Sequence, residues 1–129
     1  MIILDTPVWM EFFTGNPLYF SSVSGLMERK EILALECIFG ELLKESSGPR
    51  ERDIITGYWE HLPRADSTGL FIEAGMYLEK KPGADLINTL VLMHAKKYAV
   101  PVWTTDVNLL KLLPEELRYR DAPAKKAAR

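Results

Sequence analysis

The chain has 129 residues, of which 47% are hydrophobic and 26% are charged, and its formal net charge at pH 7 is −2. This balance is typical of one soluble globular domain, and it excludes collagen-like, largely disordered and generally polybasic proteins. The single cysteine, Cys37, excludes an intrachain disulfide, argues against a cysteine-based zinc site and fits a reducing compartment. No stretch approaches the roughly 18 apolar residues of a membrane span, so we expect a cytoplasmic protein without a membrane partner.

Short, continuous apolar runs predict buried strands. The first run is Ile2-Ile3-Leu4, a second covers residues 31–35, and a third covers residues 100–103. Residues 117–120 are a weaker candidate for an edge strand. Such runs are typical of strands that are buried on both faces, as in parallel sheets.

Apolar periodicity and turn residues predict helices between these runs. A first helix follows Asp5-Thr6-Pro7 and is stopped by Gly15-Asn16-Pro17. The further helices are expected over 18–29, 36–46, 50–61, 67–80, 85–98 and 107–113. Because strands alternate with helices, we expect an α/β domain with a mainly parallel sheet, in which ligands bind at the carboxyl ends of the strands.

Neither a repeat nor a linker divides the chain, so residues 1–121 are expected to form one domain. Residues 122–129 contain Lys125, Lys126 and Arg129 but no large apolar residue. This segment is therefore predicted to be a disordered basic tail.

Four carboxylates can be assigned to one edge of the predicted sheet. Asp5 follows the first strand, and Asp106 follows the strand over 100–103. Asp85 opens the strongly amphipathic helix over 85–98, and Glu41 lies at the edge of the apolar stripe of its own helix. A simpler interpretation exists for each: the aspartates are helix caps or dipole partners, and Glu41 is a solvated helix residue.

A cluster of like charges is costly unless a cation neutralises it. Oxygen-only ligands favour Mg²⁺ or Mn²⁺ over zinc. A cation held in this way activates water and holds a phosphate oxygen. The four carboxylates therefore indicate metal-dependent phosphodiester hydrolysis.

Four segments in this order resemble the PIN-domain family, and in particular its VapC-type toxins. They begin with Met1-Ile2-Ile3-Leu4-Asp5-Thr6-Pro7-Val8-Trp9 and continue with Ile38-Phe39-Gly40-Glu41-Leu42-Leu43. The third is Asp85-Leu86-Ile87-Asn88, and the last is Val100-Pro101-Val102-Trp103-Thr104-Thr105-Asp106-Val107-Asn108-Leu109. No single segment is specific, but the ordered set spans about residues 1–113.

The resemblance implies a three-layer α/β/α sandwich around a mainly parallel sheet of four to five strands. It implies a Mg²⁺- or Mn²⁺-dependent endoribonuclease, with Asp5, Glu41, Asp85 and Asp106 as catalytic metal ligands. Thr6 and Thr104 would support these ligands through hydrogen bonds, and Asn108 would take the variable fifth position. The resemblance also implies a homodimer and a small antitoxin protein that silences the toxin.

The sequence departs from the family pattern at two positions. Pro7 stands where serine is common, and Asn108 is neutral where many relatives carry an acid. Glu36 is an alternative for the second acidic position, although Glu41 fits the Leu-Leu context better.

Basic residues after Glu41 are candidates for contacts with RNA phosphates. They are Lys44, Arg50, Arg52 and Arg64. The alternative is that they are ordinary surface charges that keep the protein soluble.

Three other functions are compatible with parts of this pattern. The chain could be a housekeeping PIN ribonuclease for RNA processing, or a catalytically inactive PIN-like binding module. A receiver-like phosphoacceptor domain fits poorly, because Asp5 has no second acid in its loop and no lysine follows Val102-Trp103.

Overall fold

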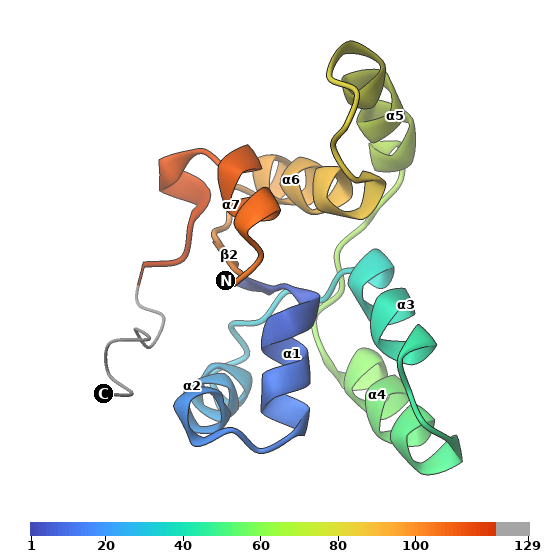
Figure 1. Ribbon diagram of the computed structural model, residues 1–129. Coiled ribbons are helices and arrows are strands. Elements are labelled where there is room, and N and C mark those ends of the chain that lie inside the picture. Colours follow the sequence, from blue (N-terminus) through green and yellow to red (C-terminus); the bar gives the residue numbers. More distant parts are fainter. Residues whose placement is uncertain (121–129) are drawn as a thin grey trace.

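The computed structural model describes residues 1–120, which form a mostly helical domain around a short parallel strand pair (Figure 1). The strands are β1 (Ile3–Leu4) and β2 (Val102–Trp103). The helices are α1 (Thr6–Phe13), α2 (Pro17–Glu28), α3 (Glu36–Lys44), α4 (Pro49–His61), α5 (Leu70–Lys80), α6 (Leu86–Tyr98) and α7 (Val107–Leu112), followed by a 3₁₀ helix over Glu115–Leu117. The predicted tail over 122–129 lies outside the described residues.

The helices lie where the sequence predicts them, within a few residues at each end. Their boundaries follow local chemistry: Asn16 accepts a hydrogen bond from the backbone N–H of Leu18, and proline occupies the first turn of α1, α2 and α4. The largest difference is at α5, which begins at Leu70 and not at Ser67. Gly69 precedes it with φ of 80°, a conformation that glycine adopts without the strain of a Cβ atom.

The expected three-layer sandwich around a sheet of four to five strands is wrong. Within residues 1–120 the regular sheet has two strands of two residues each, with Ile3 opposite Val102 and Leu4 opposite Trp103 in parallel register. The N-cap position of a helix, occupied by Asp5 before α1 and by Asp106 before α7, closely follows each strand. The chain therefore leaves the sheet almost as soon as pairing begins, and helices dominate the domain.

The remaining expected strands contribute only single parallel bridges. These bridges join Ile2 to Ile32, Ala34 to Arg64, and Val102 to Arg118. Residues 32–35 are apolar and buried but make no continuous ladder, and Leu117 still belongs to the 3₁₀ helix, so that Arg118 alone pairs with a strand. Apolar runs of this length can therefore be buried in the core without forming a continuous β-ladder.

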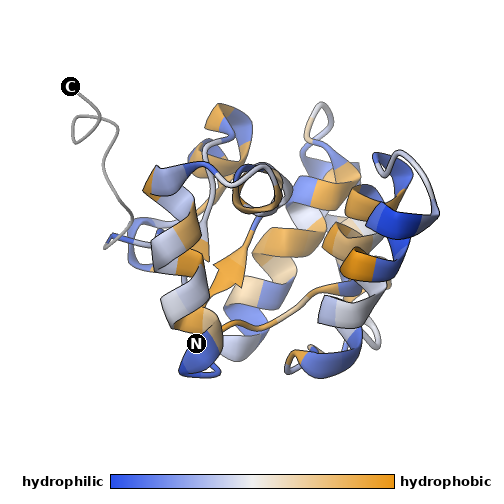
Figure 2. Ribbon diagram, turned by 90° about the horizontal axis from the view of Figure 1, so that it is seen from below, coloured by the Kyte–Doolittle hydropathy of each residue, from blue (hydrophilic) through white to orange (hydrophobic). Residues whose placement is uncertain are grey.

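The core lies between the strand pair and the inner faces of the surrounding helices. Figure 2 shows the apolar strands at the centre and hydrophilic residues on the outer turns. Trp9 and Phe12 belong to this core, with 1% and 5% of their surfaces exposed. The residues from Asn88 to Ala95 of α6 are all buried, so α6 is the central helix of the domain.

Helix α5 packs mainly against α6. Hydrogen bonds also hold the loop that precedes α5 against α6. In this loop, the hydroxyl of Ser67 lies 2.7 Å from Nε2 of His94 on α6. The backbone N–H of Asp66 donates to the hydroxyl of Tyr98 at 2.6 Å. None of the helices within residues 1–120 has the length and apolar character needed to cross a membrane.

Candidate functional site

Asp5 stands at the carboxyl end of β1, where its backbone N–H donates to the carbonyl of Trp103. Its side chain is buried, with 3% of the residue exposed. The hydroxyl of Thr104, at the end of β2, donates to Oδ2 of Asp5 at 2.6 Å. Asp5 is the residue before α1, but its carboxylate makes no regular capping hydrogen bond to that helix. The capping alternative therefore does not explain this side chain.

Glu41 is directed by a residue of α1. The hydroxyl of Thr6 donates to Oε1 of Glu41 at 2.7 Å, which joins α1 to α3 across a partly buried contact. Since Thr6 follows Asp5 directly, this bond holds Glu41 beside the end of β1. The two threonines that the family resemblance assigned to support thus contact carboxylates: Thr6 contacts Glu41, and Thr104 contacts Asp5.

Asp106 is linked to Asp5 through Thr104. Its backbone N–H donates to the hydroxyl of Thr104 at 3.0 Å, so one hydroxyl connects both acidic positions. Oδ1 of Asp106 caps α7 by accepting from the backbone N–H groups of Asn108 and Leu109. Oδ2 of Asp106 has no hydrogen-bond partner in the described part of the chain.

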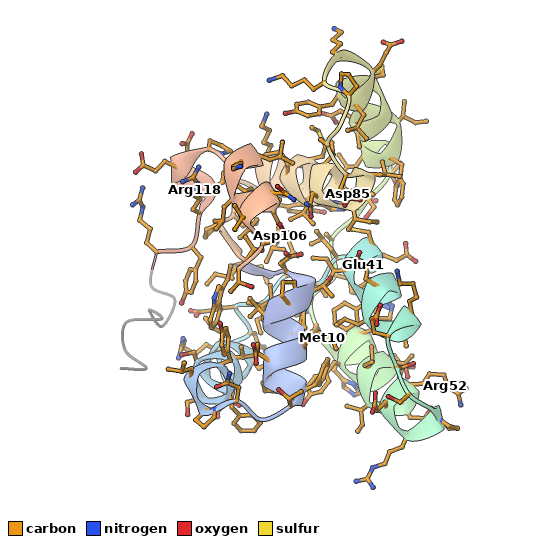
Figure 3. The ribbon with its side chains drawn as sticks, in the orientation of Figure 1. Met10, Glu41, Arg52, Asp85, Asp106 and Arg118 are labelled. Carbon is orange, nitrogen blue, oxygen red and sulfur yellow. The ribbon has the colours of Figure 1, made fainter. Side chains whose placement is uncertain are left out.

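Asp85 is the exposed N-cap of α6, where its Oδ2 accepts from the backbone N–H of Asn88 at 3.0 Å. The capping alternative is confirmed for this residue. Figure 3 shows Asp85, Asp106 and Glu41 around the region where α6, α7 and α3 come closest to the strand ends. Asn108 is exposed on the first turn of α7.

Three of the four carboxylates interact electrostatically. Burial raises the pKa of Asp5, and the charges of Glu41 and Asp106 raise it further. Hydrogen bonds from the Thr104 hydroxyl and the Thr6 backbone lower that pKa in part. Asp85 is not among the charges that act on Asp5. The centre of the site is therefore Asp5 with Glu41 and Asp106, and Asp85 stands at its margin.

These residues fit a hard dication by their chemistry but do not form a ready ligand set. All donors are carboxylate oxygens, which suit Mg²⁺ and Mn²⁺. None of the ion pairs within residues 1–120 involves Asp5, Glu41, Asp85 or Asp106, so no basic side chain neutralises them. In the same range, no three aspartate, glutamate, histidine or cysteine side chains are already close enough together to hold a metal ion.

The four basic residues that were predicted to contact RNA are all exposed. Exposure is expected both for contacts with RNA phosphates and for ordinary surface charges. Arg52 lies 3.7 Å from Asp53, and Figure 3 shows it near the end of α4 that is remote from Glu41. Arg64 lies over the ring of Trp59, with its guanidinium carbon 5.3 Å from the ring centroid. Lys44 ends α3, the helix of Glu41.

Two residues near the carboxylates were not assigned to the site from the sequence. Cys37 lies one turn before Glu41 on α3, and burial raises the pKa of its thiol to about 12, with smaller contributions from Glu41 and Asp5. Asn88 is buried in the first turn of α6. Its polar side chain on the apolar face that continues with Val91, Leu92 and Ala95 was the signal in the sequence that could have identified it.

Comparison with known proteins supports the fold and no more. No protein-family model matches the chain. The chain also has no match among curated proteins. Its structure is similar to the crystal structure of FitAcB from Neisseria gonorrhoeae, with a TM-score of 0.59 over 86% of this chain and 91% of that chain. At 15% sequence identity, this likeness concerns the arrangement of the backbone.

Proposed function

We propose that this protein is a divalent-metal-dependent endoribonuclease of the PIN-domain type and the toxin of a toxin–antitoxin pair. The observation that carries the proposal is the environment of Asp5. A carboxylate that is 3% exposed, with two further carboxylates acting on it and no basic partner, is an unfavourable arrangement unless a cation neutralises it.

The roles follow from the contacts of the chain's own residues. Asp5, Glu41 and Asp106 would hold Mg²⁺ or Mn²⁺, and Asp85 would join them from the margin. Thr104 orients Asp5, and Thr6 orients Glu41. When bound, the cation would supply an activated water and stabilise the negative charge that develops on the scissile phosphate.

The toxin role and the antitoxin partner rest on a further argument. It is the ordered set of segments that resembles the VapC-type toxins of the PIN-domain family. The similarity to FitAcB concerns the fold. A homodimer and an RNA substrate belong to the same proposal.

Cleavage of RNA by the purified protein tests the enzymatic part. With Mn²⁺, the wild-type protein should cleave single-stranded RNA, and excess EDTA should stop the cleavage. Asp5→Asn should lose it, because the neutral amide still accepts from Thr104 but no longer supplies the negative charge that attracts the cation. The matched control is Asp53→Asn on the exposed surface of α4, which should cleave like the wild type. Full activity of Asp5→Asn would refute the proposal.

One observation favours a second candidate, a catalytically inactive PIN-like binding module. It is the lack of a ready set of three ligands within residues 1–120. The two candidates differ in their response to Mn²⁺: the nuclease should melt at a higher temperature with Mn²⁺, whereas an inactive module should show little change.

A further inference from the structure

The side-chain amide of Asn88 has no hydrogen-bond partner within residues 1–120. The residue is 9% exposed, and its hydrogen bond with Asp85 is made by the backbone N–H and not by the side chain. Within residues 1–120 no fully enclosed side-chain nitrogen or oxygen lacks a partner. The amide atoms of Asn88 therefore keep a small contact with solvent.

The helical position of Asn88 directs it toward the interior. At about 100° per residue, it lies on the same face of α6 as three apolar residues that are at most 1% exposed. They are Val91, Leu92 and Ala95. The opposite face carries the exposed residues Leu86 and Lys97. The other two buried polar side chains of α6 are hydrogen-bonded, Thr89 to the carbonyl of Asp85 and His94 to the carbonyl of Leu90, whereas the amide of Asn88 is not.

The direction of the chain places this end of α6 at the carboxylates. Helix α6 leads through residues 99–101 directly into β2, so the helix runs antiparallel to that strand. Its first turn therefore lies at the carboxyl ends of the strands, where Asp5 and Thr104 are in contact. Helical side chains also tilt toward the N-terminus of their helix. The amide of Asn88 consequently faces the edge that carries Asp5.

We propose that Asn88 is a further residue of the metal site, whose Oδ1 would supply a neutral oxygen ligand beside Asp5 and Asp106. This inference rests on the proposed function. Carbonyl oxygens suit Mg²⁺ and Mn²⁺, and a neutral donor adds no repulsion to a centre where like charges already raise the pKa of Asp5. If Asn88 served only for packing, an apolar side chain would fit better, because a mostly buried amide without a protein partner loses much of its hydration.

Binding of Mn²⁺ to the purified protein, measured by calorimetry, tests the proposal without reference to catalysis. Asn88→Leu keeps the volume but removes both polar atoms. It should bind Mn²⁺ about 10-fold more weakly than the wild type, while its urea midpoint stays equal or rises. The control is Leu92→Met, one turn further on the same face, which should bind like the wild type. Asp5→Asn should lose the binding.

The outcomes separate this inference from the proposed function. If Asp5→Asn loses Mn²⁺ but Asn88→Leu binds it with wild-type affinity, Asn88 is a packing residue and the inference is wrong, while the metal site stands. If the wild type binds no Mn²⁺, the proposed metal chemistry fails, and the inference fails with it.

A second measurement needs no variant of Asn88. In the wild-type protein, Mg²⁺ should shift the side-chain ¹⁵N–¹H signals of Asn88. The corresponding signals of Asn16, which caps the remote helix α2, should not move. An unchanged Asn88 signal at a Mg²⁺ concentration that shifts the Asp5 backbone signal would also overturn the inference.

Discussion

Acidification from pH 7.5 to pH 5.5 should weaken the folded state through His94. This side chain is fully buried, and both ring nitrogens are engaged. Nδ1 lies 2.6 Å from the carbonyl of Leu90, so it carries the proton and donates, and Nε2 accepts from the hydroxyl of Ser67. Burial lowers the pKa of His94, Lys97 lowers it further, and the Leu90 hydrogen bond opposes both effects.

The sign and the size of this change in the free energy of unfolding follow from the linkage between protonation and unfolding. Because the pKa in the folded state is depressed, the unfolded chain binds the proton more readily. The stabilisation is therefore complete above the unfolded pKa of roughly 6.5, and it is lost as the pH falls toward the folded pKa. If the folded ring is still neutral at pH 5.5, the free energy of unfolding falls by about 1.4 kcal/mol relative to pH 7.5.

Urea unfolding at the two pH values, for the wild type and for His94→Gln, measures this loss. The glutamine amide can hydrogen-bond but does not titrate, so the difference between the two proteins isolates the imidazole. Carboxylates such as Asp5 titrate in both proteins, and their contributions cancel. An equal loss of free energy in His94→Gln and in the wild type would refute the reasoning.

Three further predictions concern the core and the site. Trp9→Ala should cost about 3–5 kcal/mol in urea unfolding, because the indole is 1% exposed and contacts four aromatic rings; a loss below 1 kcal/mol would contradict this packing. Without metal at pH 7, Asp5→Asn should unfold at a higher urea concentration, with a gain of about 1 kcal/mol, because the raised pKa of Asp5 marks a destabilised charge. Excess Mn²⁺ should reverse this order, and a metal-free variant less stable than the wild type would count against it. Cys37, with a pKa of about 12, should react with iodoacetamide at pH 8 roughly a thousandfold more slowly than a free thiol, as monitored by mass spectrometry; a rate near that of free cysteine would show an exposed thiolate.

The positions of the helices could be predicted because their signals are local. Asn16, Gly48 and Asp106 stand directly before helices, and each helix repeats its apolar residues along one face. The same local signals place Asp5 at the end of a buried apolar run. The extent of the sheet was predicted wrongly, because pairing depends on the distance and register of segments far apart in the chain. An apolar run such as residues 31–35 can be buried with only two isolated bridges.

For the candidate site, the sequence by itself determined which acidic residues lie near strand or helix ends. Only the tertiary structure decided how each carboxylate is used. The contact between Asp5 and Thr104 spans 99 positions, so no local pattern reports it. Tertiary packing also buried Asp5 while leaving Asp85 exposed as a helix cap, and it turned the amide of Asn88 inward. Residue type sets the chemistry that a side chain can perform, but burial and neighbouring charges arise from segments that meet only when the chain folds.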